Sequence, residues 1–201
     1  MSAGRTVSPD SVEEALRISA ALDVRFHDLR GGAVVTSKDV AFRELFRILE
    51  ASGLEYALIG GVAVQLWHSE PRTTLDIDVA VKSYESVPRA ALEAAGFRVL
   101  ARHSHSENWT GPGETPVQFS DDPAFTFLIE SATRKSFEGG QVRIASPSAL
   151  VKEKLRAASD PARRESKRFQ DLTDAKSLAE EHPEVEKQLT PGERVLLKRA
   201  L

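Results

Sequence analysis

The sequence contains no cysteine, which excludes a disulfide framework, thiolate metal ligands and a cysteine nucleophile. No apolar run approaches the ~20 residues that a membrane-spanning helix needs. Internal repeats and long low-complexity tracts are also missing. The first six residues are polar and lack the apolar centre of a signal peptide. We therefore expect a cytoplasmic protein that has no membrane partner.

A large excess of positive charge is missing as well. The 201 residues include 27 Lys+Arg and 30 Asp+Glu, a formal net charge of -3, which excludes a globally basic nucleic-acid coat. The charge is unevenly distributed, because residues 152–168 contain seven basic and three acidic side chains. Such a stretch could guide a triphosphate or an RNA acceptor, and it could equally be a solvated helical face.

The order of apolar periods predicts an α/β (α+β) fold, a mixed sheet with flanking helices followed by a helical C-terminal part. We expect an N-terminal helix and lead-in at 1–36, an α/β core at 37–146 and a helical part at 147–201. Expected helices in the first two parts are 8–22, 37–51, 62–68, 86–95 and 123–133. The expected strands are 56–59, 73–81, 97–101, 117–120 and 141–145, and the later helices are 148–158, 162–181 and 191–201.

The most informative stretch is an apolar run that stops at Gly60-Gly61, then fourteen intervening residues, then Asp76-Ile77-Asp78. Carboxylates at i and i+2 of a strand leave the same face ~7 Å apart along the backbone. They repel each other unless a cation lies between them, and Mg²⁺ suits a few carboxylates with substrate phosphates completing its coordination. A glycine turn before a helix offers unhindered backbone N–H groups to a polyphosphate. The pattern therefore predicts a metal–triphosphate site.

This segment resembles the glycine-turn and Asp-x-Asp signature of the DNA polymerase β-like nucleotidyltransferase superfamily, with Arg72 and Thr74 before Leu75-Asp76-Ile77-Asp78-Val79. The later stretch from Ser146 to Ala157, followed by Arg168-Phe169-Gln170-Asp171-Leu172-Thr173-Asp174, is similar to a conserved block of AbiEii/AbiGii-type toxins. These toxins are the nucleotidyltransferase partners in type IV toxin–antitoxin systems. The resemblance covers roughly residues 40–180.

The resemblance implies a role for each matching residue. Asp76 and Asp78 would be catalytic and would bind Mg²⁺, or Mn²⁺ in its place, and Lys154 and Asp171 would be further catalytic residues. The nucleoside triphosphate (NTP) would lie against nucleotide-binding residues, namely Gly60, Gly61, Arg72, Thr74 and Lys152. Lys152 and Lys154 are rivals, since a small error in placing the helix exchanges them. Implied partners are the NTP, an acceptor that is a tRNA 3′ end or a protein hydroxyl, and a cognate antitoxin.

The sequence departs from the superfamily pattern at two positions. Gly60-Gly61 stands where many members have Gly-Ser, so a hydroxyl contact to phosphate is missing. A third carboxylate is expected on a later strand, and Gln118 holds the candidate position; an amide is no general base and a poor Mg²⁺ ligand. Asp121, Asp122, Glu130 or Asp171 could substitute.

Three interpretations therefore remain: an AbiEii-like toxin enzyme, a small-molecule (antibiotic-type) nucleotidyltransferase, and a non-catalytic relative that binds a nucleotide or a partner. The Lys154…Asp171 block favours the first, and Gln118 permits the third.

Overall fold

The computed structural model describes residues 12, 38–68, 74, 76–137 and 140–198. Its contacts divide the chain into two compact units, Met1–Ala145 and Ser146–Leu201. The helix expected at 8–22 lies outside the described residues, apart from its position 12. None of the described helices is long and apolar enough to cross a membrane.

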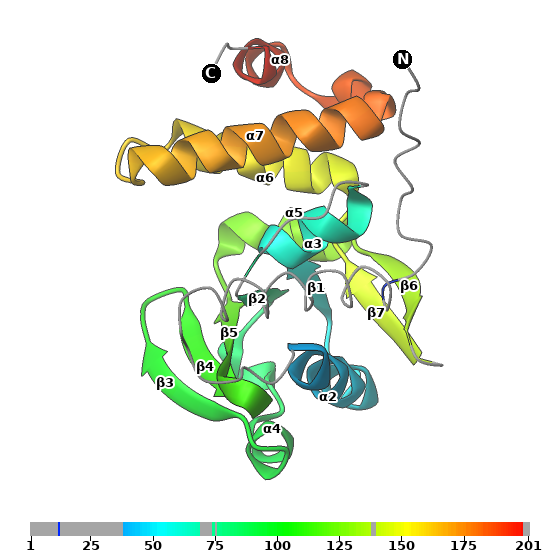
Figure 1. Ribbon diagram of the computed structural model, residues 1–201, viewed down its shortest axis with the longest axis vertical. Coiled ribbons are helices and arrows are strands. Elements are labelled where there is room, and N and C mark those ends of the chain that lie inside the picture. Colours follow the sequence, from blue (N-terminus) through cyan, green and yellow to red (C-terminus); the bar gives the residue numbers. More distant parts are fainter. Residues whose placement is uncertain (1–11, 13–37, 69–73, 75, 138–139, 199–201) are drawn as a thin grey trace, which may run out of the picture. The chain divides into compact units, whose positions relative to one another are not determined.

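The first unit is built on a mixed sheet (Figure 1). Across the described residues the strand order is β3-β4-β5-β2-β1-β7-β6. The strands are β1 (Tyr56–Ile59), β2 (Ile77–Val81), β3 (Arg98–Arg102), β4 (Glu107–Gly111), β5 (Thr115–Ser120), β6 (Thr133–Phe137) and β7 (Gly140–Ile144). Strand β2 pairs antiparallel with β1 and parallel with β5, and β1 pairs parallel with β7. This mixed sheet with its flanking helices confirms the predicted fold class.

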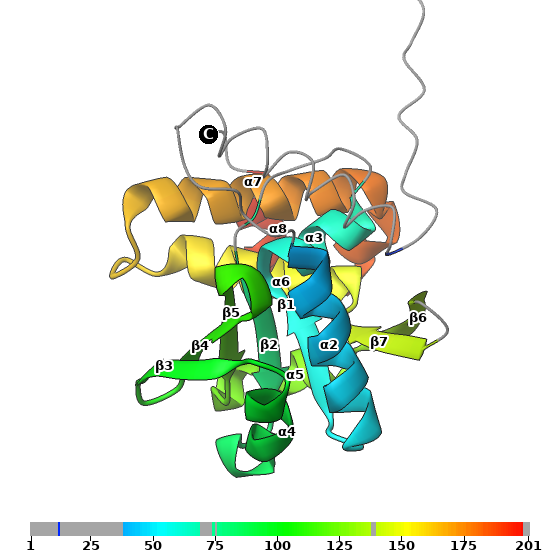
Figure 2. The same ribbon diagram turned by 60° about the horizontal axis from the view of Figure 1, so that its bottom comes forward.

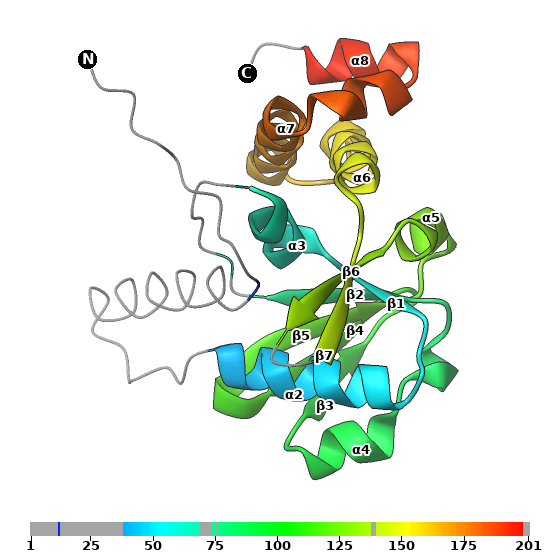
Figure 3. The same ribbon diagram turned by 90° about the vertical axis from the view of Figure 1, so that its right-hand side faces the viewer.

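Helices cover both faces of this sheet. Figure 3 shows α2 (Lys38–Ala51) and α4 (Arg89–Ala94) on one side, and α3 (Gly60–Trp67) and α5 (Thr126–Glu130) on the other. Short 3-10 turns complete the unit at Tyr84–Ser86, Pro112–Glu114 and Pro123–Phe125. All four residues of β1 are buried, as expected of a central strand covered on both faces.

The core between α2 and β1 is aromatic. The Phe42 and Phe46 rings lie 4.4 Å apart, and the Phe46 ring lies 5.5 Å from that of Tyr56. Phe42 and Phe46 share one face of α2, and Tyr56 begins the strand that follows Gly53, whose left-handed φ of +68° suits the end of the helix. The path of α2 along the sheet is visible in Figure 2.

One fully buried carboxylate was not predicted. Glu107 on β4 is 0% exposed and accepts hydrogen bonds from Arg89, Arg102 and the Trp109 indole. Burial raises the pKa of Glu107, but these donors outweigh it and leave the pKa below its usual value. The network joins α4, β3 and β4 on the sheet face that α2 and α4 cover.

The second unit is helical, with α6 (Pro147–Ser159), α7 (Glu165–Glu181), the 3-10 turn Pro183–Gln188 and α8 (Pro191–Leu197). Helix α8 begins with a capping box formed by Thr190 and Glu193. Two strands, β4 and β6, were not predicted. The helix expected at 123–133 is a 3-10 turn followed by the single short helix α5, and the helix expected to begin at 162 begins at Glu165.

Candidate functional site

The turn between β1 and α3 is made by two glycines. Strand β1 ends at Ile59 and α3 begins at Gly60, which has a left-handed φ of +67°. Only glycine adopts this conformation without strain. The residue before the helix, Ile59, has no side chain that can cap the first turn. The backbone N–H groups at the start of α3 are thus of the kind that donate hydrogen bonds to a bound anion.

Asp78 lies directly against this turn. It is half-buried on β2 and pairs in register with Ile59, the last residue of β1. A Cβ built on Gly60 would lie 1.9 Å from Asp78 Oδ2 and 2.7 Å from its Cγ. The Asp78 carboxylate therefore fills the space that a side chain at position 60 would need.

Thr74 and Asp76 complete this part of the predicted site. A Cβ on Gly61 would lie 2.5 Å from Thr74 Oγ1, so Thr74 packs on the second glycine. Asp76 is exposed and precedes β2, which begins at Ile77 rather than at the predicted residue 73. Asp76 therefore lies one residue before the strand that carries Asp78, and the shared strand face of the two carboxylates stays a prediction. Arg72 lies outside the described residues.

The expected third-carboxylate position is directly beside Asp78. Gln118 on β5 pairs with Asp78 in parallel register, and Asn108 on β4 pairs with Gln118 from the other side. Two amides thus continue the row that Asp78 begins. Because the register is fixed by the ladder, the amide at position 118 is the immediate neighbour of the carboxylate.

Three acids of the first unit were candidates for the third carboxylate, and each of them lies away from the position beside Asp78 that Gln118 occupies. Asp121 follows the end of β5, three residues beyond Gln118, and its Oδ1 lies 3.3 Å from His105 Nδ1. Asp122 accepts a hydrogen bond from the Ala124 N–H and caps a 3-10 turn. Glu130 is the last residue of α5 and is exposed. None of the three is in strand register with Asp78.

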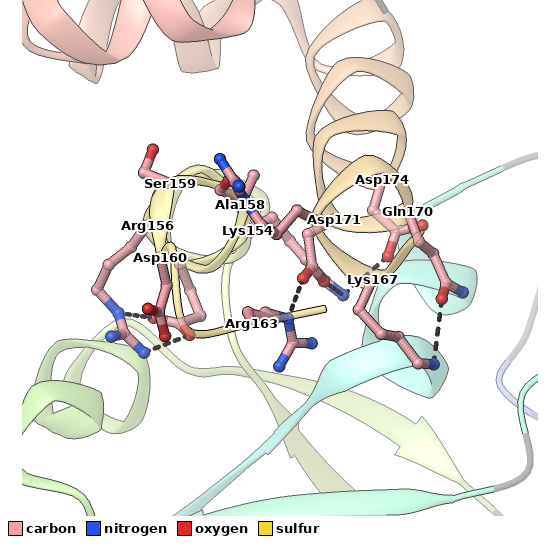
Figure 4. Close-up of polar contacts among 12 residues, drawn as sticks. Lys154, Arg156, Ala158, Ser159, Asp160, Arg163, Lys167, Gln170, Asp171 and Asp174 are labelled. Atoms are coloured by element: carbon pink, nitrogen blue, oxygen red, sulfur yellow. Dashed lines mark hydrogen bonds and ion pairs between the residues drawn. The ribbon is translucent and has the colours of Figure 1, made fainter. Parts of the chain in front are cut away.

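In the second unit, the predicted lysine and aspartate meet between α6 and α7. Lys154 Nζ lies 2.9 Å from Asp171 Oδ1 and 2.8 Å from Asp174 Oδ2, and Arg163 Nε lies 2.6 Å from Asp171 Oδ2 (Figure 4). The Lys154 side chain is only 13% exposed. Lys154 thus joins the two helices, and Asp174 is a partner that the predicted site did not include.

The charge state of Lys154 follows from this cluster. Burial lowers the pKa of its ammonium, but the neighbouring carboxylates of Asp174 and Asp171 raise the pKa further, so it ends above its ordinary value. Lys152 is two residues earlier on α6, about 200° around the helix from Lys154. Of the two rivals, Lys154 is therefore the one in contact with Asp171.

The basic stretch at 152–168 is partly neutralised by its own surroundings. Arg156 pairs with Glu153, with Nε and Oε2 2.7 Å apart, and Arg163 pairs with Asp171. The Arg168 Nε donates to the Ala158 carbonyl near the end of α6. Glu153 is already in the count and the Arg168 contact leaves its charge unchanged. The contacts that reduce the counted excess are those of Lys154 and Arg163 with Asp171 and Asp174, which lie outside residues 152–168.

Sequence comparisons identify no relative, since no protein-family model and no curated protein matches the chain. Solved structures do match it. The adenylyltransferase ANT(2")-Ia in complex with adenylyl-2"-tobramycin is similar with a TM-score of 0.52 and 15% identity, over 76% of this chain and 99% of the other. The lincosamide antibiotic adenylyltransferase LnuA, lincomycin-bound, gives 0.51 and 18%, over 73% and 99%. The Megavirus polyadenylate synthase gives 0.52 and 13%, over 91% and 40%.

The chain has a nucleotidyltransferase-like fold. At these identities the likeness establishes the fold alone. Within the nucleotidyltransferase-like fold of this chain, the β1–α3 turn and the start of β2 bring four of the predicted residues close together, namely Gly60, Gly61, Thr74 and Asp78. Lys154 and Asp171 form their own contact in the second unit.

A divalent metal fits the first cluster by the chemistry of its donors. The described residues contain no group of three His, Cys, Asp or Glu side chains able to hold a metal. Mg²⁺ is commonly bound by one or two carboxylates, with phosphates and water supplying the rest. Asp78 against the glycine turn, with Asp76 two residues away in the sequence, provides that kind of incomplete set.

Proposed function

We propose that the protein is a nucleotidyltransferase that transfers a nucleoside monophosphate from an NTP to an acceptor. One observation carries the proposal: the Asp78 carboxylate packs on Gly60, at the turn where β1 passes into α3. A carboxylate and a helix N-terminus at one point offer a cation site next to an anion site, which is what a metal-bound triphosphate requires.

In this proposal each residue has a simple electrostatic task. Asp76 and Asp78 would hold Mg²⁺, which supplies charge neutralisation at the reacting phosphate when bound. The N–H groups of the glycine turn would orient the triphosphate, and Thr74 would support the turn through its contact with Gly61. Phosphoryl transfer depends mostly on positioning and charge stabilisation, so this small set of groups is sufficient for binding and alignment.

For the acceptor we propose a tRNA 3′ end or a protein hydroxyl, as for the AbiEii-type toxins that the Lys154…Asp171 block resembles. The buried contact between Lys154 and Asp171 supports treating the two residues as one functional pair. A cognate antitoxin would then be a partner. An antibiotic-type acceptor is the alternative within the same chemistry.

The test of transfer uses NTPs labelled at the α-phosphate, Mg²⁺, and separately total RNA, a protein extract and a panel of aminoglycosides and lincosamides. We expect label to move to RNA or protein, and expect Asp76→Asn and Asp78→Asn each to abolish the transfer. Glu55→Gln is the matched control and should leave the transfer unchanged, since Glu55 is an acid of the same unit that pairs with Lys82. Transfer that survives loss of both Asp76 and Asp78 would refute the assigned site.

A second candidate function is nucleotide binding without transfer, and the register of Gln118 beside Asp78 favours it. An amide at that point cannot take the proton of an attacking hydroxyl. This candidate predicts calorimetric binding of Mg²⁺–NTP with no release of pyrophosphate at any divalent metal. Pyrophosphate release that depends on an acceptor would exclude it.

A further inference from the structure

Lys38 is a buried cation that the proposed site does not yet use. It is the first residue of α2 and is only 6% exposed, although lysine is rarely buried in folded proteins. A cation in the first turn of a helix also opposes the positive end of the helix dipole.

The Lys38 ammonium is anchored at the proposed nucleotide site. Its Nζ donates a hydrogen bond to the main-chain carbonyl of Thr74. The Thr74 side chain packs on Gly61, and the neighbouring Gly60 packs on the Asp78 carboxylate. A continuous line of contacts thus leads from the ammonium through one residue to the glycine turn.

We propose that Lys38 binds the terminal phosphates of the nucleotide. The inference rests on the proposed function and adds a residue to it. A triphosphate brings several negative charges to a site that already contains Asp76 and Asp78, so a cation besides the metal lowers the cost of binding. Lys38 is already desolvated in the folded protein, so its charge is weakly screened there.

The test compares the binding of NTP, NDP and NMP to the wild type and to Lys38→Met by calorimetry in Mg²⁺. Losing one charge-assisted contact should weaken NTP binding by about tenfold to a hundredfold. Binding of NMP, which lacks the terminal phosphates, should change by less than about twofold. Lys82→Met is the matched control, because Lys82 is a half-exposed lysine of the same unit that pairs with Glu55. Its NTP affinity should stay at the wild-type value.

A chemical rescue separates charge from structure and uses the absence of cysteine in the chain. Lys38→Cys introduces a single thiol at a buried position, so it is alkylated in urea before refolding. Bromoethylamine converts it into a lysine-like ammonium, and iodoacetamide converts it into a neutral amide. We expect the aminoethylated protein to recover NTP affinity and the carbamidomethylated protein to remain weak. If Lys38→Met does not fold, Lys38→Gln, which can still donate to the Thr74 carbonyl, replaces it in the titrations.

The outcomes distinguish this inference from the proposed function. NTP binding by Lys38→Met or Lys38→Gln that equals the wild type, or equal loss for NTP and NMP, overturns the role of Lys38 and leaves the proposed function standing. Recovery by the neutral amide as well as by the ammonium also overturns it. If the wild type binds no NTP with Mg²⁺, the proposed function is wrong, and so is the inferred role of Lys38 in phosphate binding.

Discussion

Replacing Gly60 by alanine should disable the proposed site through one added methyl group. The new Cβ would lie 1.9 Å from Asp78 Oδ2, and real Cβ contacts are essentially never below 3.0 Å. The carboxylate or the turn must therefore move by about 1 Å. A displacement of that size at a reacting centre can reduce a rate about a hundredfold. We expect Mg²⁺-dependent NTP binding and nucleotidyl transfer to fall by about that factor.

Gly53→Ala provides the control for backbone strain. Gly53 has almost the same φ, +68° against +67°, but nothing lies within 4 Å of a Cβ built on it. Both variants should lose about 1–2 kcal/mol of unfolding free energy from the left-handed backbone. Only Gly60→Ala should also lose NTP affinity.

Urea unfolding measures the stability of both variants, and calorimetry measures their affinity for Mg²⁺–NTP. The reasoning is refuted if Gly60→Ala binds the nucleotide as tightly as Gly53→Ala does. It is also refuted if both variants lose affinity to the same extent, because strain and not the contact with Asp78 would then be responsible.

Three further predictions concern substitutions that add or remove a side-chain charge. Gln118→Asp should tighten Mg²⁺ binding in a titration by about tenfold and lower metal-free stability by about 1 kcal/mol, because it places a like charge beside Asp78; unchanged metal affinity would contradict this. Glu107→Gln should lower the free energy of unfolding by about 2–3 kcal/mol at pH 7, because Arg89 and Arg102 lose their buried partner. The loss is no larger because both arginines are partly exposed and water can solvate them again. The lowered pKa of Glu107 means that its contribution is complete above the unfolded pKa of about 4.3 and is lost as pH falls further, so the difference between variant and wild type in urea unfolding should shrink in acid; a difference independent of pH would count against it. Lys154→Met should lower the free energy of unfolding by about 3–5 kcal/mol, because it removes the ammonium that two buried carboxylates contact. The raised pKa of Lys154 predicts that this loss persists up to about pH 10.4, the unfolded pKa, and disappears only above it. A loss below about 1 kcal/mol in urea unfolding would contradict the prediction.

The elements that the sequence predicts best are those determined by local pattern. Strand β1 and helix α3 follow from an apolar run that stops at two glycines, and α2 follows from helical spacing that ends at Gly53. The neighbourhood of Gln118 and Asp78 was also predictable in outline, because the resemblance assigns both to strands of one sheet. Their direct parallel pairing adds the register.

The features that the sequence did not predict depend on contacts between segments that are distant in the sequence. Strand β4 carries Glu107 and Asn108 where a strand pattern would show apolar residues, and Glu107 is buried only because Arg89 and Arg102 reach it from other elements. Strand β6 lies at the edge of the sheet and is rich in polar residues. Lys38 contacts Thr74 across 36 positions of sequence, and no local signal marks a lysine at a helix start as buried.

The pair of Lys154 and Asp171 was predicted only in part from the sequence. The resemblance predicted both residues, and the helical hairpin of α6 and α7 brings them to 2.9 Å. Asp174 is one turn further along the same face of α7, so the i, i+3 spacing was the available signal for it. Their catalytic roles, like those of Asp76 and Asp78, stay predictions.

The most direct test of the central claim is calorimetric titration of the metal-free protein with an NTP, with and without Mg²⁺, for the wild type and Asp78→Asn. The account predicts that the wild type binds NTP tightly only with Mg²⁺, and that Asp78→Asn, whose amide is nearly isosteric beside Gly60, loses this metal dependence. Equal Mg²⁺-dependent affinity in the two proteins would contradict the claim that Asp78 holds the metal at the glycine turn.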